Sequence, residues 1–304
     1  MDQRIYRGRF APSPTGPLHA GSLLVAFGSW LLARQAGGEW LVRIEDIDRP
    51  REIAGAAESQ LRTLSSFGLL ADGPVLRQST RGSAHAAAVA GLLDQGLAFE
   101  CRCSRSDLAA DVGIHRACVG RRRAAASVRL RVADGSRVAF DDLVQGRIEQ
   151  DVATAVGDFV LQRADGGPAY QLAVVVDDAA QGISYIVRGA DLLDSTPRQI
   201  LLQRALGLPT PRYAHLPLLM DAQGRKLSKS NAAAALHDDR PLPALRQAWT
   251  ALGQDPAALS DCGDTASLLA RALAAFDRER IPRQRMLPAS LTAPNRRITQ
   301  CPAR

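Results

Sequence analysis

The chain has 304 residues, of which 46% are hydrophobic and 23% are charged, the composition of an ordinary globular protein. No stretch approaches the roughly 18 consecutive apolar residues that a membrane helix needs, and the N-terminal segment lacks the apolar centre of a signal peptide. We therefore expect a cytoplasmic protein of about two domains. Membrane, collagen-like and disordered classes are excluded.

The basic residues are unevenly divided between arginine and lysine. The formal net charge of +7 favours a polyanionic partner such as a nucleic acid. Of 38 basic residues only two are lysines, Lys226 and Lys229. Because arginine supplies positive charge everywhere else, this pair indicates a role for a compact, flexible ammonium group; coincidence is the alternative.

The first part of the chain predicts a βαβ unit. A strand over 5–11 passes into a loop rich in proline and glycine, and apolar residues at helical spacing predict a helix over 18–35. A second strand is expected at 39–44, and a further helix near 52–67. This order indicates an α/β fold with a parallel sheet.

Further along, the alternation of residues 127–132 and 137–140 around Asp134-Gly135 predicts a β-hairpin. The other expected elements are a helix at 81–97, a strand at 183–187, a helix at 197–206, a polar loop at 221–230 and helical structure beyond 237.

The segment 9–22, RFAPSPTGPLHAGS, lies where the first strand passes into the first helix. The free amides and dipole of a helix N-terminus bind phosphate. His19 can hydrogen-bond phosphate oxygens there, and Gly21 lets a nucleotide approach the backbone. A lone His19 would be an ordinary helical histidine, but the length of the motif favours phosphate binding.

The second motif is KLSKS, residues 226–230, in the expected polar loop. Two ammonium groups and two hydroxyls on a mobile loop can close over a triphosphate and neutralise the charge of departing pyrophosphate. A solvated surface loop is the alternative. It is disfavoured because the only two lysines of the chain are both here.

Together these motifs resemble the two signatures of class I aminoacyl-tRNA synthetases. His19–Ser22 stands in place of the HIGH motif, from which its fourth position departs, and KLSKS matches KMSKS with Leu for Met. RFAPSPTGPLHAGSL (Arg9–Leu23) and RIEDIDRPR (Arg43–Arg51) are similar to the glutamyl-specific branch. The resemblance spans Arg9 to Ser230 and implies a Rossmann-like parallel sheet.

The resemblance also implies the substrates ATP, with Mg²⁺, and L-glutamate. By this resemblance His19 and Lys229 are catalytic and stabilise phosphate charge. The residues implied for ATP are His19, Gly21, Lys226, Ser228 and Lys229.

A glutamate pocket needs cations for two carboxylates and an anion for one ammonium group. The resemblance implies Arg9 and Arg188 as carboxylate-binding residues, a task that suits arginine, and Glu45 for the ammonium. An ion pair of Glu45 with Arg43 or Arg49 is the alternative. The other residues implied for glutamate are Phe10, Ala11, Pro12, Ser13 and Tyr170.

Three cysteines and one histidine are candidate metal ligands: Cys101, Cys103, His115 and Cys118. Three sulfurs and one imidazole suit a single tetrahedral, structural Zn²⁺. Buried cysteines beside a surface histidine are the alternative. The glutamyl branch often carries CxC followed by Tyr and Cys, whereas here His115 replaces the tyrosine and the last gap is one residue shorter.

The expected organisation is a catalytic domain over 1–236, an insertion at about 98–150 that carries the metal ligands, and a helical, basic region over 237–304. Only 74 residues follow Ser230, too few for the anticodon-binding region of a glutamyl-tRNA synthetase. The chain therefore most resembles the shortened family, the glutamyl-Q tRNA(Asp) synthetases.

That resemblance implies activation of glutamate with ATP in the absence of tRNA. Transfer to the queuosine base at the wobble position of tRNA(Asp) follows. The alternatives are a truncated glutamyl-tRNA synthetase that charges the tRNA 3′ end, a tRNA-binding protein without catalysis, and another HIGH-type nucleotidyltransferase such as pantothenate synthetase.

Overall fold

The computed structural model describes residues 5–104, 106–109, 112–119, 124–221, 223–227 and 234–287. Its helices and strands are, in chain order, β1 (Arg7–Phe10), α1 (Ala20–Gln35), β2 (Glu39–Ile44), α2 (Ala56–Ser66), β3 (Leu76–Arg77), α3 (Gly82–Asp94), β4 (Ala98–Cys101), β5 (Ser127–Leu130), β6 (Arg137–Asp142), β7 (Gly146–Asp151), α4 (Val152–Ala155), β8 (Val160–Gln162), α5 (Tyr170–Ala180), β9 (Tyr185–Gly189), α6 (Thr196–Ala205), β10 (Arg212–Leu216), β11 (Leu218–Leu219), α7 (Pro241–Ala251), α8 (Thr265–Ala275) and β12 (Met286–Leu287).

Two sheets meet edge to edge at the centre of the molecule. One has the order β1-β2-β3, all parallel, and the other has the order β7-β6-β10-β9, in which β10 is parallel to both β6 and β9. Strands β1 and β9 adjoin where the Ser184 amide donates to the Arg7 carbonyl at 3.0 Å. In open α/β sheets, ligands bind beyond the carboxyl ends of strands at such a change of strand order.

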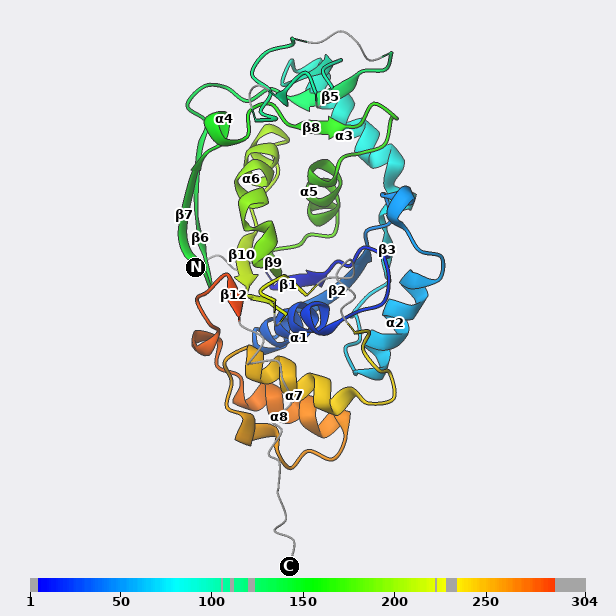
Figure 1. Cartoon of the computed structure of the whole chain (residues 1–304), viewed down its shortest axis with the longest axis vertical. Coiled ribbons are helices and arrows are strands. Elements are labelled where there is room, and N and C mark those ends of the chain that lie inside the picture. Colours follow the sequence, from blue (N-terminus) through cyan, green and yellow to red (C-terminus); the bar gives the residue numbers. More distant parts are fainter. Residues whose placement is uncertain are drawn as a thin grey trace, which may run out of the picture.

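Helices cover both faces of these sheets (Figure 1). Helix α1 lies on one face with α7 and α8 packed against it, and α5 and α6 lie on the other. The α1 interface is tight at Gly28, where an added Cβ would come within 2.7 Å of Leu216. A glycine inside the helix thus allows close contact between α1 and β10.

The third sheet, β4-β5-β8, is antiparallel and lies at the end of the molecule opposite α7 and α8 (Figure 1). Its apolar side chains pack with those of α3, α5 and α6 in one cluster.

The proposed domain division at residue 236 stays a prediction. Among the described residues, no helix is both long and apolar enough to cross a bilayer.

Most of the predicted elements are confirmed, including the N-terminal βαβ unit with its parallel strands. The predicted hairpin of 127–132 with 137–140 is wrong. Strand β5 pairs with β4 and β8, whereas β6 pairs with β7 and β10. A turn is present at Gly135, which has a φ of 73°. That turn carries the chain from one sheet to another, because alternation predicts strands but not their partners.

Candidate functional site

A cavity of about 750 Å³ opens at the carboxyl ends of β1, β2, β9 and β10. It gathers nearly all the residues that the sequence predicts for glutamate and ATP. Ser228 and Lys229 lie outside the described residues. The predicted residues on its wall are Arg9, Phe10, Ala11, Pro12, Ser13, His19, Gly21, Glu45, Tyr170, Arg188 and Lys226.

The two signature motifs lie on the same wall of this cavity. His19 caps the N-terminus of α1, where its Nδ1 accepts a hydrogen bond from the Ser22 amide at 3.3 Å. A Cβ on Gly21 would lie 3.0 Å from the His19 ring and 3.6 Å from the Leu227 carbonyl. The loop that bears Lys226 thus adjoins the helix N-terminus, an arrangement that suits a bound phosphate chain.

Four buried charges hold the base of the cavity together. Asp178 on α5 accepts from Arg9 Nε at 3.0 Å and from Arg43 Nη1 at 2.7 Å. Arg43 also reaches Glu45, with 3.2 Å between Nη2 and Oε1. The alternative ion pair of Glu45 with Arg43 is therefore present, and Glu45 still lines the cavity. Two guanidinium groups and two carboxylates leave this set without net charge.

The environment shifts the two carboxyl groups in opposite directions. Burial raises the pKa of Glu45 by more than Arg43 and Arg9 lower it. Burial acts in the same way on Asp178, but Arg43 and Arg9 outweigh it and hold the pKa of Asp178 below its usual range. Of the two carboxyl groups, Asp178 is therefore the one whose ionised form the two arginines favour more strongly than burial opposes it.

Arg188 lies apart from this balanced set, at the end of β9. Its Nε donates to His215 at 3.0 Å and its Nη2 donates to Thr196 Oγ1 at 2.8 Å. Its Nη1 is buried without a hydrogen-bond partner, and among the described residues no carboxylate forms an ion pair with it. Arg188 thus keeps one buried guanidinium nitrogen without a partner among the described residues, which is costly unless a ligand pairs with it.

Tyr170 begins α5 and separates this cavity from a second one of about 790 Å³. The two cavities share Ser13, Glu45, Arg51 and Tyr170. Burial, and then the charge of Glu45, raise the pKa of Tyr170, so its hydroxyl stays protonated. The second cavity extends toward the third sheet, where Cys103 lies on its wall.

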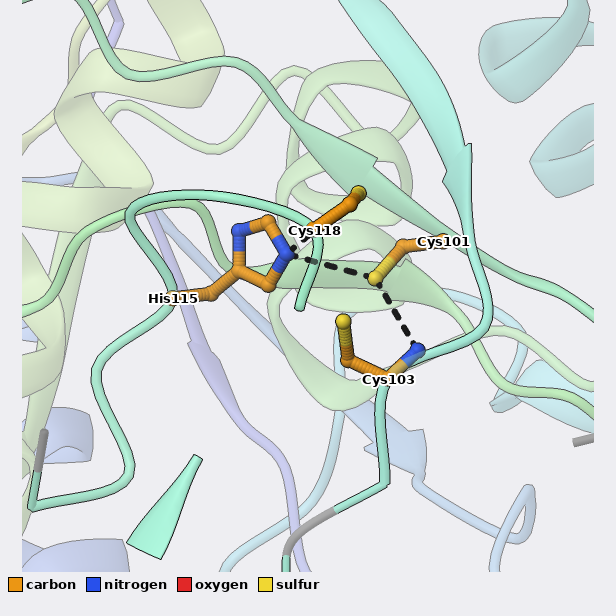
Figure 2. Close-up of side chains that lie close together, drawn as sticks. All are labelled: Cys101, Cys103, His115 and Cys118. Carbon is orange, nitrogen blue, oxygen red and sulfur yellow. Dashed lines mark hydrogen bonds between the residues drawn. The ribbon is translucent and has the colours of Figure 1, made fainter. Parts of the chain in front are cut away.

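The four candidate metal ligands converge, as Figure 2 shows. Their ligand atoms all lie within 4.8 Å of one another. His115 Nε2 is 3.3 Å from Cys101 Sγ and 3.7 Å from Cys118 Sγ. A tetrahedral ion with bonds of about 2.0–2.3 Å needs ligand separations of roughly 3.3–3.8 Å. Cys101, Cys103, His115 and Cys118 could therefore hold one metal ion.

The surroundings of the cluster support metal binding. The other ring nitrogen of His115, Nδ1, is 2.9 Å from Asp158 Oδ2, the kind of carboxylate contact that orients metal-binding histidines. Burial, Cys101 and Cys103 raise the pKa of Cys118 to about 11. Thiolates this close repel one another, and a divalent cation removes that repulsion.

Comparisons with known proteins agree with this geometry. The chain matches the family described as "tRNA synthetases class I (E and Q), catalytic domain" over residues 6–117 and 119–248. It is 64% identical over 285 residues to the glutamyl-Q tRNA(Asp) synthetase of Xanthomonas oryzae pv. oryzae, over 94% of this chain and 95% of that protein. The chain belongs to the glutamyl-Q tRNA(Asp) synthetase family.

Other members of the family are also similar to this chain. The glutamyl-Q tRNA(Asp) synthetase of Burkholderia mallei is 53% identical over 294 residues, which covers 90% of this chain and 96% of that protein. The crystal structure of a glutamate tRNA ligase from Elizabethkingia meningosepticum matches with a TM-score of 0.77 at 23% identity, over 93% of this chain and 66% of that one. That likeness concerns the fold.

The predicted fold class, a class I synthetase with an α/β parallel sheet, is therefore confirmed, as is a ligase of the aminoacyl-tRNA synthetase type. Sequence reasoning missed the buried partners Asp178, His215 and Asp142. One signal could have found Asp178, because the pair Asp177-Asp178 interrupts the apolar residues of α5. His215 likewise stands between two apolar residues of β10, Ala214 and Leu216.

Proposed function

We propose that the protein activates L-glutamate with ATP, without tRNA, and then transfers the glutamyl group to the queuosine base at the wobble position of tRNA(Asp). The names of its relatives support this reaction. The observation that carries the proposal is the buried Arg188 Nη1, unpartnered among the described residues, in a cavity that also holds Glu45, His19 and Lys226.

The charge of the cavity supports glutamate as the ligand. Arg9, Arg43, Glu45 and Asp178 pair with one another, whereas Arg188 forms no ion pair among the described residues, so its guanidinium is available to a carboxylate of the ligand. One carboxylate against Arg188, the other near Arg9, and the ammonium near Glu45 would give each charged group of glutamate a partner of opposite sign.

In the first step, an oxygen of the glutamate α-carboxylate would attack the α-phosphorus of ATP while the bond to the leaving pyrophosphate breaks. This reaction depends on positioning and charge neutralisation. His19 and Lys226 would bind phosphate oxygens, with Lys229 and Mg²⁺ assigned to the triphosphate by resemblance. ATP, glutamate and tRNA meet in the cytoplasm, where we propose that the enzyme works.

In the second step, a hydroxyl oxygen of the modified base would attack the carbonyl carbon of glutamyl-adenylate and AMP would leave. The second cavity adjoins the glutamate residues through Ser13, Glu45 and Tyr170. Its volume of about 790 Å³ is large enough for a nucleoside. We propose that the acceptor base enters there.

Glutamate-dependent ATP–pyrophosphate exchange is expected in the complete absence of tRNA. The cavity holds residues for both substrates, so no tRNA is needed to complete it. Aspartate should support little exchange, because its shorter side chain cannot place one carboxylate at Arg188 and the other at Arg9. Exchange that appears only after tRNA is added would favour a conventional glutamyl-tRNA synthetase, and equal rates with aspartate would contradict the glutamate pocket.

We also propose that the four-ligand cluster holds one structural Zn²⁺. Purified protein should contain about one zinc per chain, because three sulfurs and one imidazole complete a closed tetrahedral site. Elemental analysis of wild type, Cys103→Ser and Cys262→Ser tests this. Cys262 is a buried cysteine outside the cluster, so its variant should retain zinc while Cys103→Ser loses most of it.

Loss of zinc should impair transfer to tRNA more than glutamate activation, since the cluster lies outside the first cavity. If purified wild-type protein contains no zinc, or if Cys103→Ser and Cys262→Ser contain equal amounts, this assignment is contradicted.

A further inference from the structure

A hydrogen-bonded chain of three buried polar side chains, the last of which is Arg188, crosses the sheet β7-β6-β10-β9. It runs from Asp142 at the end of β6, through His215 on β10, to Arg188 on β9. Strand β10 pairs with both neighbours and places His215 opposite Arg188 in the parallel register. Asp142 and His215 have no exposed side-chain surface, and Arg188 is 4% exposed.

The hydrogen-bond donors fix the tautomer of the histidine. Arg188 Nε can only donate, so His215 Nε2, 3.0 Å away, must accept. The ring proton is then on Nδ1, which donates to Asp142 Oδ2 at 2.6 Å. The other oxygen of Asp142 accepts from the backbone amides of Val144, Gln145 and His215. Burial, together with the charges of Arg188 and Arg9, lowers the pKa of His215 more than Asp142 raises it, so the ring is neutral near pH 7.

This chain, together with two further contacts, holds the guanidinium of Arg188. Nε is bound by His215 and Nη2 by Thr196, whose hydroxyl also lies 3.1 Å from His215 Nε2. The ring of Tyr213 packs 5.7 Å from the guanidinium carbon. Nη1 has no hydrogen-bond partner in the part of the chain that the structure describes, and Arg188 lines the cavity.

We infer that His215, oriented by Asp142, is a positioning residue that presents Arg188 to the carboxylate of bound glutamate. This inference rests on the proposed function of the cavity. The opposite tautomer of His215, with its proton on Nε2, would place two hydrogen-bond donors, Arg188 Nε and His215 Nε2, opposite each other. Arg188 would then turn away from the ligand.

The variant Asp142→Asn tests this inference through the tautomer. The amide oxygen can still accept from the backbone amides, while the amide NH₂ then faces His215 Nδ1 and favours a proton on Nε2. We expect the glutamate KM in ATP–pyrophosphate exchange to rise about 10- to 100-fold, the effect of one lost hydrogen bond to a charged group. The KM for ATP should change less than about twofold, since the phosphate-binding residues are untouched.

Nitrogen NMR provides a readout that a merely structural role would not move. The chain has five histidines, so protein labelled with ¹⁵N-histidine gives few signals, and His215→Gln identifies that of His215. Wild type should show a neutral ring protonated on Nδ1, and Asp142→Asn should show one protonated on Nε2. A wild-type ring that is charged, or protonated on Nε2, would overturn the inference.

A second pair of variants covers the case in which Asp142→Asn does not fold. The amide oxygen of His215→Gln can still accept from Arg188 Nε, whereas His215→Leu offers no acceptor, so the glutamate KM should be clearly lower for His215→Gln. His85→Gln is the matched control, because His85 is a buried histidine bound to Asp177 but absent from the cavity wall. Its glutamate KM should equal that of wild type.

The outcomes separate the inference from the proposed function. Wild type without glutamate-dependent exchange would refute the proposed function. Active wild type, with the same glutamate KM in Asp142→Asn, His215→Gln and His215→Leu, would overturn the positioning role alone.

Discussion

Replacing Arg188 with alanine is expected to raise the glutamate KM of ATP–pyrophosphate exchange by about 30-fold to several thousandfold, or roughly 2–5 kcal/mol. Arg188 is 4% exposed, and its Nη1 has no partner among the described residues. The variant would leave a ligand carboxylate without its cation. It would also leave His215 and Thr196 without the donors that they accept from.

Arg147→Ala is the control for this experiment. Arg147 lies on β7, its side chain is 63% exposed, and it is absent from both cavities. The glutamate KM of this variant should match that of wild type. Initial-rate exchange assays at saturating ATP measure both values. A rise in the glutamate KM of less than about threefold for Arg188→Ala would refute the assigned role, because losing a buried charge pair should raise the KM by about 30-fold or more.

The second large effect is expected on stability, for Asp178→Asn. Asp178 is the buried carboxylate that Arg9 and Arg43 share, with side-chain exposures of 3%, 4% and 0% respectively. Removing its charge leaves two buried guanidinium groups without their main counterion. Breaking a buried ion pair in this way costs about 3–5 kcal/mol, so the free energy of unfolding in urea should fall by that amount.

Asp141→Asn provides the matched control. Asp141 pairs with Arg147 at 3.1 Å, but the two side chains are 79% and 63% exposed. Exposed pairs contribute about 0–1 kcal/mol, so this variant should unfold almost as wild type does. Equal destabilisation by the two variants would contradict the view that Asp178 anchors the base of the cavity.

The pH dependence of the Asp178 effect has a defined sign. Arg43 and Arg9 outweigh the effect of burial and hold the pKa of Asp178 below its usual range. A carboxyl group of this kind stabilises the fold above its unfolded pKa of about 3.9, and this stabilisation is lost as the pH falls through the folded value. The difference between wild type and Asp178→Asn should therefore be constant near neutral pH and shrink below about pH 4.

Much of the cavity could be predicted from sequence because its residues stand in short motifs next to strand ends. Strand β1 carries Arg9 near its carboxyl end, the segment after it carries His19, and the segment after β2 carries Glu45. Apolar periodicity predicts those strands and helices. Parallel strands then bring their carboxyl ends to one edge, so residues distant in sequence meet without any knowledge of contacts.

The residues that hold these groups in place could not be predicted in the same way. Asp178 lies 169 positions after Arg9, and Asp142 lies 73 positions before His215. Each of these pairs depends on which elements become neighbours, and local periodicity carries no such information. The wrong hairpin has the same cause, because the turn at Gly135 is visible in the sequence but the partners of the two strands are not.

The position of transferred glutamate on tRNA(Asp) tests the central claim most directly. Radiolabelled glutamate and ATP are supplied with queuosine-containing and with queuosine-lacking tRNA(Asp), and the products are mapped with nucleases. We expect label only on the queuosine-containing tRNA, and within its anticodon fragment. Label on the terminal adenosine, or equal labelling of both tRNAs, would contradict transfer to queuosine.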